Sequence, residues 1–257
     1  MSWNYISSVY KGYAVSNSLM VNIESDGKIL PRLLISRSNI LEFFTVSSNS
    51  IELDFQIEIF ANITKIEKIA TDIKDAPSFL FILSNNLEYG FVTVKNGQLI
   101  TKYADSVPIG SHIGNDAEEI KVIQEFTRTG STVSNFYLGL YALSGIVNIF
   151  VLKLLNNNDI AIDKMFNIRL PFQKIMDLGT LPNCNFKTSN PLLAILCEED
   201  HRDRKKCFKV MELNLINAEL LARATVWEIN FSADLTVNKF QSAADGSVLF
   251  FSEMSIR

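Results

Sequence analysis

Residues 32–60 read RLLISRSNILEFFTVSSNSIELDFQIEIF, and the last third of this stretch decides the fold class. In it every second residue is apolar: Ile51, Leu53, Phe55, Ile57 and Ile59. This period of two is typical of a β-strand with one wet face, because an amphipathic helix would place its apolar residues three and four apart. Two apolar segments precede it, separated by the polar turns RSN and SSNS, so the stretch predicts three consecutive strands.

The same unit recurs along the chain as a short apolar strand followed by a turn and a further strand. The apolar runs begin at Leu33, Leu80, Leu138, Leu193 and Leu249. Subtracting successive positions gives spacings of 47 to 58 residues. A repeat of this length with several strands indicates the blades of a β-propeller. We therefore expect an all-β chain of four-stranded antiparallel blades, with about five blades in one domain over residues 1–257 and the fifth cut short.

Local signals fit strands joined by turns. Asn96-Gly97 is a strong two-residue hairpin signal, because both residues tolerate positive φ. Residues 106–121 (SVPIGSHIGNDAEEIK) and 182–191 (PNCNFKTSNP) are rich in turn formers and predict long loops. Residues 218–224 (AELLARA) favour a helix by intrinsic propensity. Their place in the fourth repeat favours a strand, which is what we expect.

Composition excludes several classes of protein. The 257 residues are 47% hydrophobic and 20% charged, which allows a sizeable core. A net charge of -4 and a pI near 5.3 disfavour nonspecific binding to nucleic-acid phosphates. The longest apolar run, residues 146–155, is too short to cross a membrane and contains Asn148 and Lys153. The N-terminus has no signal-peptide pattern, so we expect no membrane association.

The three cysteines are odd in number and have no metal-type spacing; they are Cys184, Cys197 and Cys207. Cys197 and Cys207 flank a charged loop between two predicted strands, which would place them across a hairpin. Both features favour thiols in a reducing, intracellular compartment over a disulfide framework.

The sequence lacks motifs for catalysis or cofactor binding. No phosphate-binding glycine loop occurs, and Asp116, Glu118 and Glu119 lack the ligand spacing of a calcium loop. His112 and His201 stand in separate polar loops without metal-type spacing and are expected to be solvated. We therefore predict a protein that is not an enzyme, with no catalytic residue, no cofactor and no metal site.

The basic run of Arg202, Arg204, Lys205 and Lys206 directly follows three acidic residues, so its field is largely neutralised. A mixed-charge hairpin tip is a better interpretation than a nucleic-acid contact. The function class that remains for this chain is a protein-binding scaffold, because propellers commonly present loops on a rigid body. No motif identifies individual protein-binding residues. A propeller hydrolase or lyase is the alternative from another class, and it would need a polar cluster around the central channel.

Several strings together carry a family resemblance. In chain order they are MSWNY, LLISRSNILEFFTV, FLFIL, LGLYALSGIVNIF, FNIRLPFQKIMDLGTL and GSVLFFSEM. They resemble the N-terminal propeller of the large subunits of UV-damaged DNA-binding complexes, the adaptor family of cullin-4 ubiquitin ligases. The superfamily also includes the largest cleavage-and-polyadenylation specificity subunit and a propeller scaffold of splicing factor 3B. FNIRL (Phe166 to Leu170) favours the adaptor branch.

The resemblance implies a non-catalytic adaptor in which this chain, as a truncated part, supplies about five of the seven blades of the first propeller. It would help form the cleft that receives WD-type substrate receptors, while cullin-4 binds a downstream propeller. The resemblance also implies nuclear and cytoplasmic localisation, roles in DNA repair and protein ubiquitination, and at most indirect nucleic-acid contact within the full complex. A scaffold of mRNA splicing or 3′-end cleavage and polyadenylation complexes is the alternative.

Overall fold

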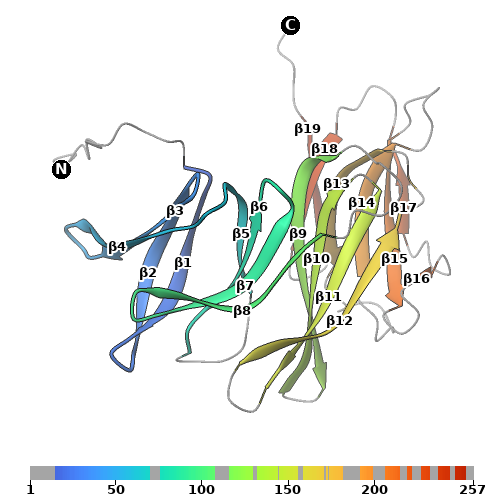
Figure 1. Ribbon diagram of the computed structural model, residues 1–257. Coiled ribbons are helices and arrows are strands. Elements are labelled where there is room, and N and C mark those ends of the chain that lie inside the picture. Colours follow the sequence, from blue (N-terminus) through green and yellow to red (C-terminus); the bar gives the residue numbers. More distant parts are fainter. Residues whose placement is uncertain are drawn as a thin grey trace, which may run out of the picture. The chain divides into compact units, whose positions relative to one another are not determined.

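Every regular element that the computed structural model describes is a β-strand, which confirms the all-β fold class (Figure 1). The structure describes residues 15–69, 76–107, 116–129, 132–143, 145–155, 159–170, 172, 174–181, 192–198, 206–214, 219–221, 227–231, 237–243 and 247–252. No helix that could span a membrane occurs in this part of the chain. The chain forms two compact units, Met1–Val107 and Pro108–Arg257.

The first unit contains two antiparallel four-stranded meanders. Their strands are β1 (Asn17–Ser25), β2 (Lys28–Arg37), β3 (Ile40–Val46), β4 (Ile51–Glu58), β5 (Ile63–Ile69), β6 (Phe79–Ser84), β7 (Glu88–Lys95) and β8 (Gln98–Ser106). Each strand pairs with its neighbours in sequence, in the orders β4-β3-β2-β1 and β5-β6-β7-β8. One parallel pair, Glu24 with Lys95, links β1 to β7, and these two side chains form an ion pair of 2.8 Å.

Tight turns join these strands where the residue types allow them. Asn96 and Gly97, between β7 and β8, have φ angles of 50° and 72°, which confirms the predicted two-residue turn. Asp26 and Gly27 repeat this geometry between β1 and β2. Positive φ strains most side chains, so these short residues help to fix the register of both hairpins.

The second unit contains three sheets. Its strands are β9 (Asp116–Thr129), β10 (Thr132–Leu143), β11 (Ile146–Leu154), β12 (Ile160–Arg169), β13 (Lys174–Leu181), β14 (Leu192–Glu198), β15 (Lys206–Asn214), β16 (Glu219–Leu221), β17 (Trp227–Asn230), β18 (Val237–Ser242) and β19 (Val248–Ser252). Strands β9 to β12 form a meander, and β18 pairs with β19. In the middle sheet β16 and β17 pair with successive parts of β15, so together they take the place of a fourth strand.

All five apolar runs fall on the second strand of their sheet, namely β2, β6, β10, β14 and β19. In β6 and β14 the reason is burial on both faces: every residue of β6 is buried, and so is every residue of β14 except the last. In β2 only Leu34 and Ser36 are buried. Strand β19 differs, because Leu249 and Phe251 are about half exposed. Five successive antiparallel sheets, the last with two described strands, agree with an incomplete propeller-like fold.

Apolar clusters pack each sheet against the next one within its unit. In the first unit Phe43 and Leu34 pack with Leu80 and Val92, which joins the first meander to the second. In the second unit one cluster joins β9–β12 to β13–β15, and another joins β13–β15 to β18 and β19. Burial between successive sheets is therefore the main source of cohesion within each unit.

Two expectations about residues 106–121 and 218–224 can be compared with the structure. The long loop predicted over 106–121 is wrong for residues 116–121, which belong to β9. Pairing with β10, which places Lys121 opposite Tyr141, extends the strand despite its polar sequence. In the second segment Glu219–Leu221 is a strand, as expected, because it completes the ladder on β15. The loop predicted at 182–191 lies outside the described residues.

Substitution of Gly139 in β10 by alanine should destabilise the second unit. An added Cβ would lie 2.6 Å from Ile123 Cγ1 and 3.1 Å from Ile149 Cδ1, in a core with no room for it. We expect the free energy of unfolding to fall by about 2 kcal/mol, measured by urea denaturation. Gly90→Ala is the control, because its nearest contacts would be 3.6 Å. Equal effects of the two changes would contradict the packing argument.

Candidate protein-docking site

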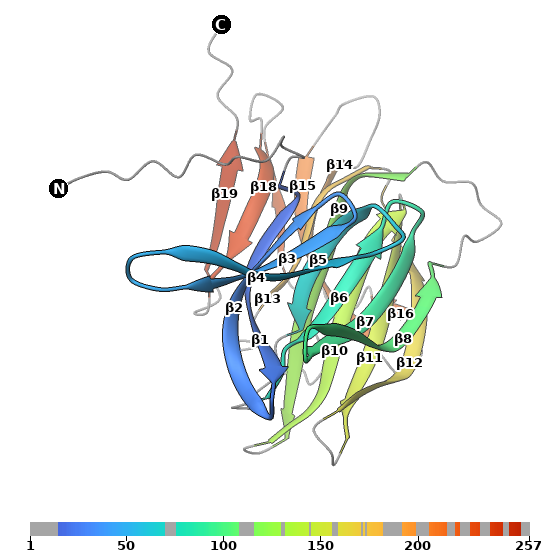
Figure 2. The same cartoon turned by 60° about the vertical axis from the view of Figure 1, so that its left-hand side comes forward.

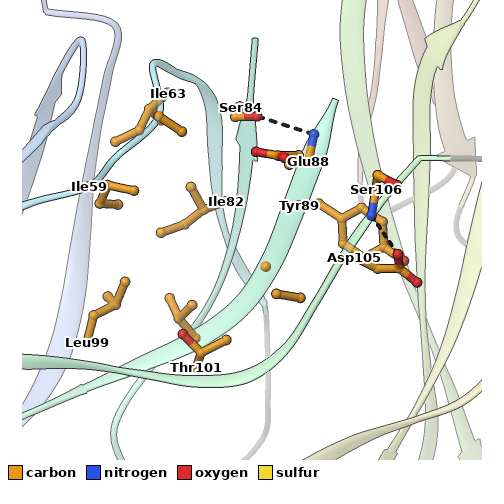
Figure 3. A pocket seen from close by; sticks show the side chains of 14 residues that line it. Ile59, Ile63, Ile82, Ser84, Glu88, Tyr89, Leu99, Thr101, Asp105 and Ser106 are labelled. Carbon is orange, nitrogen blue, oxygen red and sulfur yellow. Dashed lines mark hydrogen bonds between the residues drawn. The ribbon is translucent and has the colours of Figure 1, made fainter. Parts of the chain in front are cut away.

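An open cavity of about 490 Å³ lies in the first unit (Figure 3). Its apolar wall comprises Ile59, Ile63, Ile82, Val92 and Leu99, and its polar wall includes Ser84, Glu88, Thr101 and Asp105. Figure 3 shows Ile59 and Ile63, from the β4–β5 connection and β5, facing Ile82 of β6 and Leu99 of β8. The cavity therefore continues the apolar layer between the two meanders out to the surface.

Two polar side chains of the cavity form hydrogen bonds within the protein. The Ser84 hydroxyl accepts hydrogen bonds from the backbone N–H groups of Asn86 and Glu88, at 3.3 and 3.2 Å, and so organises the β6–β7 turn. The Asp105 carboxylate accepts the Ser106 backbone N–H at 2.8 Å and the Tyr103 hydroxyl at 2.9 Å. These groups stabilise strand ends and leave apolar contact as the main interaction that the cavity offers.

Hydrogen bonds and burial shift the pKa values of three groups at or next to the cavity, namely Asp105, Tyr103 and Tyr89. The hydrogen bond from the Ser106 backbone, followed by that from the Tyr103 hydroxyl, lowers the pKa of Asp105 below its usual value. The same bond to Asp105 raises the pKa of Tyr103. Burial raises the pKa of Tyr89. The carboxylate therefore stays ionised and both phenols stay neutral, so none is poised as an acid or a base.

Phe60 stands between two residues that line the cavity, Ile59 and Ala61. Its side chain is fully exposed, at 106% of the reference value. At the other end of β4, Ile51 and Leu53 are each nearly half exposed. Figure 2 shows the β3–β4 hairpin standing out from β1 and β2. Phe60 does not itself line the cavity, but an exposed phenylalanine between two residues of an apolar cavity wall is a candidate anchor for a protein contact, because aromatic anchors dominate such contacts. We call Phe60 and this cavity the docking site.

A second cavity, of about 370 Å³, lies in the second unit among β9, β13 and β18, the first strands of three sheets. Its wall includes three lysines and one buried aspartate, Asp177. The Asp177 carboxylate accepts the backbone N–H groups of Leu178 and Phe240, both at 2.9 Å, and lies 3.1 Å from Lys121 Nζ. This carboxylate therefore ties the three strands together.

Neither cavity could be located from the sequence. The lining of the first cavity combines residues from 59 to 106, which come from several strands. The second cavity combines positions more than 100 residues apart. Its one local signal is Asp177 itself, a carboxylate between the apolar residues Met176 and Leu178 of the strand KIMDLGTL.

The residues weighed for chemistry on sequence grounds are only partly described. His112, His201, Cys184, Arg202, Arg204 and Lys205 lie outside the described residues. Lys206 is not at a free hairpin tip, because its ammonium group donates to the Val237 carbonyl at 3.2 Å. Cys197 and Cys207 do lie opposite each other on β14 and β15, as expected. In the described part of the chain no three His, Cys, Asp or Glu residues form a group that could hold a metal ion.

Comparison with known proteins adds no relative of established function. No protein-family model matches the sequence, and no curated protein is significantly similar to it. The evidence on function is therefore the docking site and the family resemblance of the sequence strings.

Proposed function

We propose that this chain is a non-catalytic protein-interaction scaffold of the cullin-4 ubiquitin ligase adaptor class. The observation that carries the scaffold role is the docking site, where a fully exposed Phe60 adjoins an open apolar cavity. The adaptor class rests on the resemblance from MSWNY to GSVLFFSEM. In this role the chain helps to form the cleft for WD-type substrate receptors, and cullin-4 is bound through a separate propeller.

The engagement of two polar side chains of the docking site within the protein supports a binding role over catalysis. The side chains of Ser84 and Asp105 are engaged in hydrogen bonds to their own strands and turns. The fourteen residues that line the cavity include no histidine, cysteine or lysine. A hydrolase or lyase centre would need a nucleophile or a base aimed at open space.

The adaptor proposal is tested by affinity purification of the endogenous gene product followed by mass spectrometry. We expect cullin-4 and WD-type substrate receptors among the proteins recovered. Recovery of splicing or cleavage-and-polyadenylation subunits in their place would assign the protein to the RNA-processing branch. Recovery of neither set would refute both scaffold assignments.

Replacement of Phe60 by serine should weaken receptor capture at least tenfold without changing the melting temperature. A buried aromatic anchor contributes about 2 kcal/mol or more to a protein interface, whereas an exposed side chain contributes little to folding. The matched control is Met20→Ser, because Met20 on β1 is also exposed but neither of its neighbours in sequence lines the cavity. Quantitative pulldown of WD-type receptors measures both variants, and equal capture by Phe60→Ser and the unmodified chain would exclude Phe60 from the interface.

A further inference from the structure

Cys197 of β14 and Cys207 of β15 occupy directly opposite positions in the antiparallel ladder. Both side chains are fully buried, and their sulfur atoms lie 3.3 Å apart without a disulfide bond. Opposed residues in such a ladder have Cα atoms about 4.5–5.5 Å apart, which lies inside the range that a disulfide spans. The backbone is thus already arranged for a bond between the two sulfurs.

We propose that Cys197 and Cys207 form a reversible disulfide on exposure to a hydroperoxide. Their site is distinct from the docking site, because it lies in the second unit. The proposal rests on the geometry of the β14–β15 hairpin alone and holds whether or not the chain is a ligase adaptor.

The position of the pair at the end of the hairpin explains how a buried thiol can be reached. Among the described residues of this hairpin, one further pair, Glu198 with Lys206, follows the cysteines. Both of these residues are partly exposed. The ends of a ladder open locally at much lower free energy than its centre, so a small oxidant can enter by brief opening of this last pair.

The oxidation balances with one molecule of hydroperoxide. One cysteine, as the thiolate, attacks the terminal peroxide oxygen, the O–O bond breaks, and the cysteine becomes a sulfenic acid while water or an alcohol leaves. The second thiolate attacks the sulfenic sulfur, the S–S bond forms, and the sulfenic hydroxyl leaves as water after taking up a proton. Two thiols are oxidised and one peroxide is reduced.

A metal is a poorer partner for this pair. A structural zinc site needs four ligands, usually cysteine and histidine, and two opposed cysteines supply only half of that set. In the described residues no third potential ligand joins them. The short distance between the sulfurs also suits a bond between them, since two thiolates around zinc are held apart by the ion.

The proposal is tested in cells that express the 257-residue chain. The cells are exposed to hydrogen peroxide, quenched with acid and alkylated with N-ethylmaleimide under denaturing conditions, and the tryptic peptides are mapped by mass spectrometry. We expect a peptide pair joined through Cys197 and Cys207, with at least tenfold loss of alkylation at both, while Cys184 stays alkylated. Dithiothreitol added before alkylation should restore both labels.

Two controls make the outcome decisive without a mutant that might fail to fold. The Cys184→Ser variant should give the same linked pair. The urea-unfolded chain, treated in the same way, should give a mixture that includes Cys184 linkages. Persistent alkylation of Cys197 and Cys207 after peroxide, or the same mixture of linkages in the folded chain, would overturn the proposal.

Discussion

Replacement of Phe208 by alanine is expected to lower the free energy of unfolding by about 4 kcal/mol, as for a large aromatic removed from a packed core. Phe208 of β15 is fully buried. Its ring lies 5.0 Å from those of Phe240 on β18 and Phe250 on β19, both edge-to-face. The substitution would therefore leave a cavity between two sheets and remove two favourable ring contacts.

Chemical denaturation followed by circular dichroism measures this loss as a lower denaturant midpoint. Phe251→Ala is the matched control, because Phe251 is the neighbour of Phe250 on β19 but about half exposed. We expect less than about 1 kcal/mol for that change. Similar midpoints for the two variants would show that β18 and β19 do not pack on β15 through Phe208.

Replacement of Asp177 by alanine should cost about 3 kcal/mol, because it removes the acceptor shared by three donors at a buried position. The backbone N–H groups of Leu178 and Phe240 lose their bonds, and Lys121 loses the carboxylate that lies 3.1 Å away. Asp177→Asn should cost less, since its one amide oxygen can still accept a hydrogen bond. Thermal and urea denaturation of both variants measure which substitution lowers the free energy of unfolding more.

The matched control for Asp177 is Asp163→Ala in the same unit. Asp163 forms an ion pair of 2.6 Å with Lys153, but both side chains are substantially exposed. Exposed pairs contribute at most about 1 kcal/mol, so the control should change stability little. The Lys121→Met variant then separates the ion pair from the two backbone bonds. If Lys121→Met costs as much as Asp177→Ala, the carboxylate acts mainly through the lysine rather than as a link between strands.

The strands were predictable because their signals are local. The alternation from Ile51 to Ile59 and the apolar runs at Leu80 and Leu193 reflect burial on one face or on two, which any neighbouring sheet would impose. The Asn96-Gly97 turn was predictable for the same reason, since backbone conformation there depends on two residues. The limits of β9 were not, because Asp116 is held in a strand by β10, which is distant in sequence.

The docking site and the second cavity depend on tertiary structure. The alternation from Ile51 to Ile59 places Phe60 on the opposite face of the strand, but it does not show that a cavity lies beside this position. The importance of Asp177 depends on Phe240, which lies 63 residues away and donates to its carboxylate. The period of apolar residues predicts which face of a strand a residue occupies. It does not predict which residues from other strands or sheets pack against that face.

The meander topology has a consequence for synthesis of the chain. Strand partners are neighbours in sequence almost throughout, and the rung between Glu24 and Lys95 is a rare long-range exception. Closing such short loops costs little entropy, so each sheet can form soon after its own residues leave the ribosome. The apolar face of that sheet stays exposed until the next sheet has been synthesised. For example, Phe208 stays uncovered until β18 and β19 have been made. Within each unit the nascent chain therefore carries an uncovered apolar face at its growing end until the next sheet of that unit has been made.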